Sequence, residues 1–470
     1  MSGRLIMDRV DIRLGHTGDN GVADRVEQVR VGMYLWTIVM RNRLFFAFWV
    51  LRPRQLRMVL RVLCVCLLCD QHIQAKEPGG VEAELWLTSG EKTSGQVVEI
   101  ETEQLTLRIG EANQNVPVTE VWQVALAGPA RRPPRPTYWL YLTNGDRWGI
   151  RSVKLTDEEL EFRLTGDEQT HKLSIGSVTG IQPVRPGTSW RTDESEWLQL
   201  AGRREKSDLV ILRNGDHQTG EISTLDDQGL TLSGSLGTKT LEWTGVSGLL
   251  LNPDLAEVPA PVPAGWTVLL SDESWLTVSS IRLIPQGKCQ LQTIHNIEWS
   301  TSLDGIRWLS HWDSGTVPLS RLPIGSQKHQ PLLGETFTTA IDRNVRGLPL
   351  RYNTVDDTVD RTKVRYPSVF PQGVGMSSGM TVQWKLDGNY RRLLCGLCLD
   401  TTACPAGHAV VKFIVNDQPP LTVSLRAGDP LIGPTTLDLT GVQTLTIETE
   451  YGENADVCDW INLLTPVLVR

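Results

Sequence analysis

The chain has 470 residues, of which 21% are charged and 40% are hydrophobic, as in soluble globular proteins rather than disordered tails. This length predicts about three domains. The net charge of −8 excludes the basic field that holds nucleic acid, so no nucleic-acid partner is expected. Sixteen Trp stand against seven Tyr and seven Phe, and we expect core packing to account for most of these indoles.

Residues 1–75 have the composition of an extension followed by a secretory signal peptide. Residues 1–57 are basic, and their apolar stretches are shorter than the ~20 residues of a membrane span, so no integral span is expected. A basic flank, the apolar run VLCVCLLC at 62–69 and Ala75 before a polar start resemble an export signal. We expect translation from Met58, cleavage after Ala75 and a periplasmic, cell-surface or secreted location; a buried apolar helix is the alternative.

Export would place the cysteines where disulfides form. Three of the eight cysteines lie in the predicted signal, and five follow it. An odd number leaves at least one thiol free. The five are Cys289, Cys395, Cys398, Cys404 and Cys458.

A pattern of short apolar strands recurs four times between residues 80 and 315. LTNGD at 142–146 and LRNGD at 212–216 read as strand ends followed by Asn-Gly hairpin turns, which need positive φ. Units of this length with five curled strands predict an all-β chain of tandem SH3-like barrels, and the motif resembles the Sm-like fold. The predicted boundaries are 80–127, 137–183, 207–252 and, for a degenerate fourth copy, 265–315.

Sm-like proteins bind RNA, so an RNA-binding role is one alternative for the repeats. The acidic charge, the missing RNA-contact signature and the expected export all disfavour it. A role as spacers or contacts for other envelope proteins is preferred. Pro-rich linkers such as GPARRPPRP at 128–136 separate the predicted units.

Residues 316–470 read as one β-sandwich. Alternating apolar positions predict strands, turns such as Asp387-Gly388 separate them, and no helical period interrupts the series. The predicted strands are 381–386, 391–399, 409–415, 421–425, 435–439, 445–450 and 460–469.

The same region resembles a known family through DRNVRG at 342–347, LPLR at 348–351 and the stretch 373–400. It resembles the carbohydrate-binding-type module attached to glycoside hydrolase family 98, which is also common in secreted proteins of planctomycete-like bacteria. The resemblance implies a galactose-binding-like jelly roll with a carbohydrate or glycoconjugate as partner. The family's Gly-x-Gly-Val-His-Ser turn reads GVGMSS at 373–378, so Ser377 replaces the histidine and leaves open an altered or inactive site.

Aromatic and polar residues at the predicted turns are the candidate ligands of a sugar. Trp460 follows Asp459 at a strand start and can offer its ring, whereas Trp384 lies in an alternating strand and reads as core. The candidate binding residues are Trp460, Asp459, Tyr390, Arg392 and Ser377.

Acidic residues and cysteines of the same region are candidates for a metal site and for disulfides. Asp400 and Asp456 could help hold a structural calcium ion, with loop caps as the alternative; no other cofactor is expected. The family usually has two adjacent acids where this chain has Asp400 followed by threonine. A Cys₃His zinc site is suggested by the spacing of Cys395, Cys398, Cys404 and His408, but disulfides are favoured. The two pairings considered are Cys398–Cys404 and Cys395–Cys458.

No Gly-x-Ser-x-Gly elbow, phosphate loop or His-Glu-x-x-His motif is present, so no enzyme activity is expected. The sequence predicts a non-catalytic exported glycan-binding protein. The alternative is a structural or protein-interaction protein of the cell envelope, with RNA binding as a further alternative.

Overall fold

The computed structural model describes residues 80–128, 133–184, 206–235, 237–285, 287–333, 335–352, 369–416 and 418–470. In these ranges every regular element is a β-strand apart from short 3-10 turns, which confirms the all-β prediction. The predicted signal peptide, the start at Met58 and the cleavage after Ala75 lie outside the described residues. None of the described residues belongs to a helix long and apolar enough for a membrane crossing.

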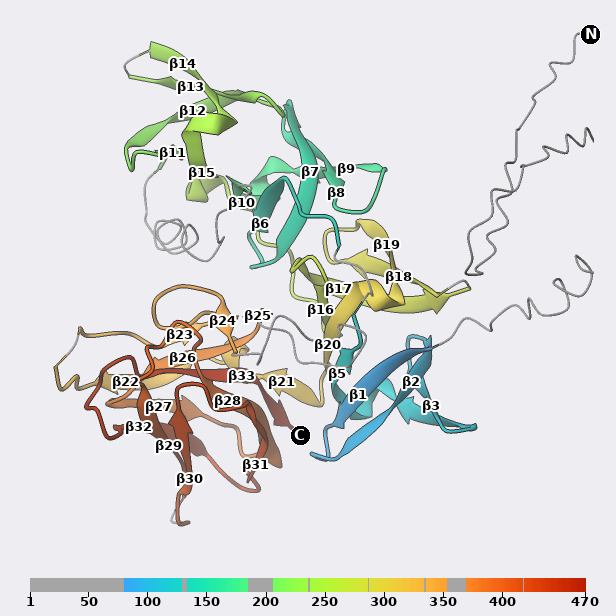
Figure 1. The fold of residues 1–470 in the computed structure, drawn as a ribbon, viewed down its shortest axis with the longest axis vertical. Helices are drawn as coiled ribbons and strands as arrows, with labels where there is room; N and C mark the ends of the chain where they lie inside the picture. The colour runs from blue at the N-terminus through green and yellow to red at the C-terminus, as the bar shows by residue number, and fades with distance from the viewer. Residues whose placement is uncertain are drawn as a thin grey trace, which may run out of the picture. The chain divides into compact units, whose positions relative to one another are not determined.

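Residues 80–312 contain four groups of five strands, named repeats 1 to 4 in chain order (Figure 1). In each repeat the first four strands form an antiparallel meander in sequence order, and the fifth pairs back with the first. The elements of repeats 1 and 2 are β1 (Val81–Leu87), β2 (Lys92–Ile100), β3 (Gln104–Ile109), β4 (Ala112–Pro117), η1 (Val118–Glu120), β5 (Val121–Leu126), β6 (Tyr138–Leu142), β7 (Arg147–Thr156), β8 (Glu159–Leu164), β9 (Thr170–Ser174), η2 (Ile175–Ser177) and β10 (Val178–Pro183). Those of repeats 3 and 4 are β11 (Asp208–Leu212), β12 (His217–Leu225), β13 (Gly229–Gly234), β14 (Gly237–Glu242), η3 (Trp243–Gly245), β15 (Val246–Leu250), η4 (Pro253–Leu255, between the repeats), β16 (Gly265–Leu270), β17 (Trp275–Ile284), β18 (Lys288–Thr293), β19 (Glu298–Ser302), η5 (Leu303–Gly305) and β20 (Ile306–Trp312).

A left-handed residue lies at the same place in the first hairpin of every repeat. Gly90, Gly145 and Gly215 have φ of 88°, 90° and 87°. Glycine adopts this conformation without steric cost, which is why the pattern recurs in the sequence. Repeat 4 has Glu273 there, at φ 73°, so its hairpin forms although the glycine signal is lost.

One hydrophobic cluster runs through all four repeats. Leu85, Leu140, Val210 and Val268 occupy the same position of the first strand, and all four are fully buried. The period of two along each strand directs these residues inward, so the core follows directly from the alternating pattern.

The repeats associate out of sequence order. β5 pairs with β20, where Val124 lies opposite Leu309, and β10 pairs with β15, where Ile181 lies opposite Leu249. Repeats 2 and 4 meet through their second strands, β7 and β17. Contacts between repeats therefore follow the order 1–4–2–3.

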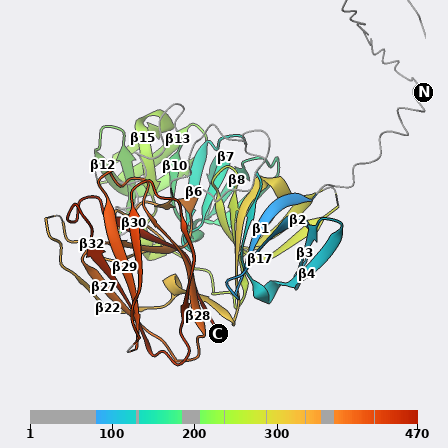
Figure 2. The same cartoon turned by 60° about the horizontal axis from the view of Figure 1, so that its bottom comes forward.

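The region after repeat 4 folds as two antiparallel sheets (Figures 1 and 2). One sheet has the order β23-β26-β33-β28-β31, with β21 added beside β33, and the other has the order β22-β27-β32-β29-β30. A second hydrophobic cluster fills the space between them and includes Trp384 and Phe413. The elements are β21 (Thr316–Pro318), η6 (Leu319–Arg321), β22 (Ile324–His329), β23 (Ala340–Ile341), β24 (Leu350–Arg351), β25 (Val369–Phe370), β26 (Gly373–Ser377), β27 (Met380–Lys385), β28 (Arg392–Leu399), β29 (His408–Val415), β30 (Leu421–Arg426), β31 (Ile432–Asp438), β32 (Thr444–Tyr451) and β33 (Trp460–Val469); β24 and β25 pair with each other.

The sandwich also packs against the repeats through tryptophans that point away from the repeat cores. Trp86 and Trp122 of repeat 1 share a buried cluster with Leu394 and Val467 of the sandwich. The indole N–H of Trp122 donates to the Thr465 carbonyl at 3.2 Å. This contact accounts for part of the high Trp content, since these indoles fill a surface between modules.

Candidate functional site

The predicted sugar-binding residues lie at two opposite ends of the sandwich. Trp460 begins β33, whereas Arg392 lies opposite Val469 at the other end of that strand. β33 has ten residues, so at about 3.3 Å per residue the two ends are about 30 Å apart. The five predicted ligands therefore cannot form one site, and we call the two regions the Trp460 end and the Tyr390 end.

The residues at the Tyr390 end are engaged in structural contacts. The ring of Tyr390 is buried beneath the Arg470 guanidinium, 4.6 Å from its centroid, and its hydroxyl accepts from Arg470 at 3.2 Å. Arg392 donates to the carbonyl oxygens of Thr88 and Ser89 in repeat 1. The structure therefore does not bring the predicted ligands Tyr390 and Arg392 together with Trp460, because side chains close in sequence to a turn need not face the same loops.

Ser377 lies at the Trp460 end but is buried. It lies opposite Trp460 in the pairing of β26 with β33, and the residue is only 3% exposed. Its carbonyl oxygen accepts from the Thr449 hydroxyl at 2.6 Å. Ser377 is thus buried within the sandwich, and its predicted contact with a ligand gains no support from this placement.

Trp460 is half-buried, and a guanidinium lies over its ring. The Cζ atom of Arg346 is 4.7 Å from the indole centroid. Arg346 comes from a turn shaped by the fully buried Asn344, whose side-chain oxygen accepts from the backbone N–H groups of Arg346 and Leu348, both at 3.0 Å. The amide therefore fixes the turn that carries the arginine. Sequence reasoning missed Arg346, although it lies within the DRNVRG motif.

A disulfide joins the two loops nearest Trp460. It links Cys404, between β28 and β29, to Cys458, between β32 and β33, with Cα atoms 5.5 Å apart. The two predicted pairings are wrong, because Cys395 and Cys398 lie inside β28 and are buried and free. Cys395 faces the core between the sheets, and Cys398 faces the opposite side, so neither reaches a loop cysteine.

Asp459, which follows Cys458, connects the start of β33 to the start of β29. The carboxylate is fully buried and accepts from the backbone N–H of His408 at 2.8 Å. Burial raises the pKa of Asp459, an effect opposed by the N–H of His408 and the side chain of Ser378. Asp459 therefore orders the strand start that presents Trp460 and lacks the exposure of a sugar ligand.

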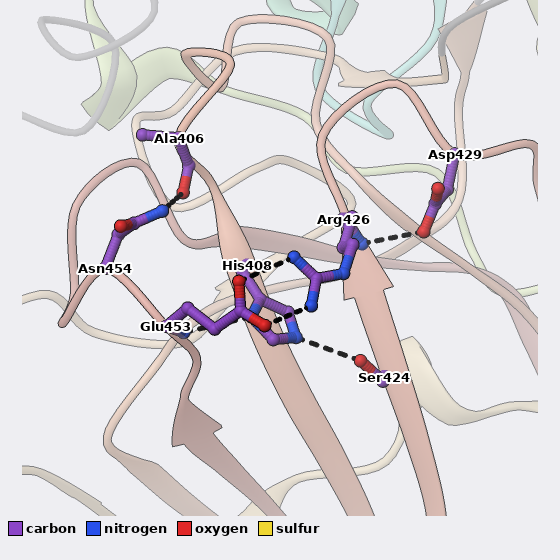
Figure 3. A network of polar contacts seen from close by, with 7 residues as sticks. All are labelled: Ala406, His408, Ser424, Arg426, Asp429, Glu453 and Asn454. Carbon is purple, nitrogen blue, oxygen red and sulfur yellow. Dashed lines mark hydrogen bonds and ion pairs between the residues drawn. The ribbon is translucent and has the colours of Figure 1, made fainter.

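Figure 3 shows the polar network around His408. Its Nδ1 accepts from the backbone N–H of Glu453 at 2.9 Å, so the proton of the neutral ring lies on Nε2, 3.0 Å from the Ser424 hydroxyl. Glu453 forms a bidentate pair with Arg426, at 3.0 and 2.5 Å. Asn454 donates to the Ala406 carbonyl at 2.9 Å. These contacts hold the loop before Trp460 against β29 and β30.

The predicted metal ligands serve as loop caps. One oxygen of Asp400 accepts from the backbone N–H of Thr402 at 2.9 Å, and the other accepts from the Asn462 amide at 2.8 Å. Asp456 accepts from the backbone N–H groups of Leu332 and Leu333 at 2.7 and 2.8 Å. Within the described ranges no three His, Cys, Asp or Glu side chains gather as metal ligands do, so neither the calcium nor the zinc interpretation gains support.

The Trp460 end thus combines a partly exposed aromatic face with a cation on rigid loops. An indole face packs on the apolar C–H groups of a pyranose ring, and a guanidinium donates to hydroxyl oxygens. Two packed antiparallel sheets with such loops at one end form a jelly-roll sandwich.

One family model matches the part of the chain that contains the sandwich. Residues 315–469 match the family described as NPCBM/NEW2 domain. No curated protein matches the chain.

Solved structures that match parts of this chain include carbohydrate-binding modules of the CBM51 type. One is CBM51-2 with INT domains from Clostridium perfringens ZmpB in complex with GlcNAc, at 14% identity and TM-score 0.29, covering 41% of this chain and 38% of that one. Another is CBM51 from Clostridium perfringens GH95 in complex with methyl-galactose, at 12% identity and TM-score 0.28, covering 33% of this chain and 99% of that one. A third is the tandem CBM51 pair of the family 98 glycoside hydrolase Sp3GH98 from Streptococcus pneumoniae, at 10% identity and TM-score 0.26, covering 67% of this chain and 87% of that one. The chain spans 38% of the first of these proteins.

Proposed function

We propose that this chain is a non-catalytic, exported protein that binds a carbohydrate or glycoconjugate at the Trp460 end of its sandwich. The observation that carries the proposal is the half-buried Trp460 with Arg346 against its ring. It lies in the part of the chain that matches the NPCBM/NEW2 domain.

The geometry favours binding because the loops are already ordered. The Cys404–Cys458 disulfide and the Asp459 carboxylate hold both sides of the strand start at Trp460. A preformed site loses less conformational entropy when a ligand binds. The sugar would contact the indole through its C–H groups and Arg346 through its hydroxyls.

A glycan array probed with the full chain, followed by calorimetry on any positive glycan, tests the proposal. We expect Trp460→Ala to abolish binding and Tyr390→Phe, at the opposite end, to retain it. Trp384→Phe serves as a core control, because Trp384 is fully buried. Binding that survives Trp460→Ala, or that is lost with Tyr390→Phe, would refute this location.

A second function is supported by the cluster that Leu394 and Val467 form with Trp86 and Trp122. In this alternative the sandwich is a packing module that stabilises the repeats, within a structural protein of the cell envelope. Absence of binding to every glycan on the array, for a correctly folded chain, would favour it.

A further inference from the structure

The junction between repeats 2 and 4 has an approximate two-fold symmetry. Arg147 and Trp275 occupy the same position in their repeats, one residue after the first hairpin turn, and they lie opposite each other. The Trp275 indole donates to the Gly145 carbonyl at 2.8 Å, and the Arg147 guanidinium donates to the Glu273 carbonyl, also at 2.8 Å. Each side chain thus binds the turn of the other repeat.

A second pair of contacts follows the same symmetry. The Asp146 carboxylate accepts from the Thr277 backbone N–H at 2.8 Å and from its hydroxyl at 2.7 Å. In the mirrored position, the Ser274 hydroxyl accepts from the Gly149 backbone N–H at 2.8 Å. The first-hairpin turn is therefore an interface that two copies of one repeat can share.

The same turn is covered in repeat 1 as well. Arg392 of the sandwich donates to the Thr88 and Ser89 carbonyl oxygens, and Thr436 lies against Gly90. Among the four turns, all within described ranges, those of repeats 1, 2 and 4 are thus occupied by other parts of the chain.

The turn of repeat 3 is exposed. All five residues from Arg213 to His217 are exposed, and so is Thr219. The two positions after the turn residue, which are buried in repeats 2 and 4, are therefore open to solvent in repeat 3.

Repeat 3 has both residue types of the contact between Asp146 and Thr277. By the shared hairpin register, Asp216 corresponds to Asp146 and Thr219 corresponds to Thr277. Two copies related by a two-fold axis could then form the carboxylate–threonine contact twice. Arg213 and Asp216 have opposite charges, so the two turns would not repel each other.

We propose that the first-hairpin turn of repeat 3 binds the same turn of a second copy of this chain, in the geometry of the repeat 2–repeat 4 junction. His217 of each copy would meet at the two-fold axis, where Arg147 and Trp275 meet inside the chain. The proposal concerns a surface remote from Trp460 and does not depend on sugar binding.

Cysteine substitution at the axis gives a direct test. Residues opposite each other in an antiparallel pair have Cα atoms about 4.5–5.5 Å apart, within disulfide range. We expect His217→Cys to form a covalent dimer of the full chain under mild oxidation. The parent chain gives the background from its own cysteines, and Glu168→Cys, at a residue whose side chain is 84% exposed, reports random collision. Cross-linking of His217→Cys no greater than that of Glu168→Cys would overturn the proposal.

Sedimentation equilibrium provides a second measurement on the full chain, whose mass is 52.3 kDa. We expect concentration-dependent dimerisation of the parent chain. Thr219→Val removes one hydroxyl–carboxylate hydrogen bond per copy and should weaken the dimer about tenfold or more. Thr219→Arg should abolish the dimer, whereas Thr170→Arg, at an exposed residue of β9, should not. A dimer that persists in Thr219→Arg would contradict the proposal. So would a repeat 3 turn that binds a different protein but not a second copy of this chain.

Discussion

Replacing Asp146 by asparagine should remove a pH dependence of stability and leave the repeat 2–repeat 4 junction intact. The carboxylate is 3% exposed and accepts from the N–H and hydroxyl of Thr277 and, at 3.3 Å, from the Trp148 indole. Burial raises its pKa from 3.8 to about 6. An asparagine oxygen can still accept from the two N–H groups, while its NH₂ donates to the Thr277 hydroxyl.

The sign of the effect follows from the raised pKa. A carboxyl whose pKa is higher in the folded state stabilises the fold at low pH, and this contribution is lost as pH rises through the folded value. With 3.8 for the unfolded chain and about 6 for the folded one, the loss between pH 4 and pH 7 is about 2 kcal/mol. Asparagine does not titrate, so the free energy of unfolding of the variant should lack this decrease.

Urea unfolding at pH 4 and pH 7, followed by tryptophan fluorescence, measures the difference between the parent chain and the Asp146→Asn variant. Subtracting the two chains cancels the titration of all other groups. Asp146→Ala is the comparison variant, because it leaves three donors without an acceptor at about 1–3 kcal/mol each. The reasoning would be refuted by a difference between parent and Asp146→Asn that is the same at both pH values, or by an asparagine variant as unstable as the alanine one.

Three further predictions concern other parts of the chain. Replacing both Cys404 and Cys458 by serine opens a link across 54 residues and should cost roughly 4 kcal/mol in denaturant unfolding of the sandwich; an unchanged midpoint would contradict this. Trp122→Ala removes a buried indole from the contact with the sandwich, so we expect a loss of about 3–5 kcal/mol and faster proteolysis between the modules, with unchanged cleavage as the opposing result. Burial raises the pKa of the Cys395 thiol to about 12, so this thiol should react with a disulfide reagent in urea but not in the native chain at pH 8; rapid native labelling of Cys395 would argue against its burial.

Local signals in the sequence predicted the strands and turns well, because they depend on neighbouring residues. The turns at Gly145 and Gly215 follow from Asn-Gly, and Trp384 was correctly read as core from its alternating strand. Glycine also recurs five residues after the turn glycine, at Gly95 and Gly220. A Cβ at Gly95 would lie 2.7 Å from the Arg108 carbonyl oxygen, so glycine is needed there for close strand approach, while the bulge in β2 falls at residues 97–99.

Contacts between distant segments could not be read in this way. Every residue of β5 is buried, one face in its own repeat and the other against neighbouring parts. An apolar sequence of this kind does not identify the strand with which it pairs. The disulfide partners are 54 residues apart, and their approach depends on how two sheets stack. Tyr390 and Trp460 both follow predicted turns in the sequence, yet the strands between them carry the two residues to opposite ends of the sandwich.

The pairing of β5 with β20 has a consequence for biosynthesis. Val124 meets Leu309 only after about 185 further residues have been made, which at ~5–20 residues per second takes roughly 10–40 s. Until then repeat 1 presents an unpaired apolar strand edge, the kind of surface on which nascent chains aggregate. Repeat 4 is made last of the four repeats and covers strand edges of both repeats 1 and 2. A chain whose translation stops before residue 306 would therefore be released with these edges unpaired.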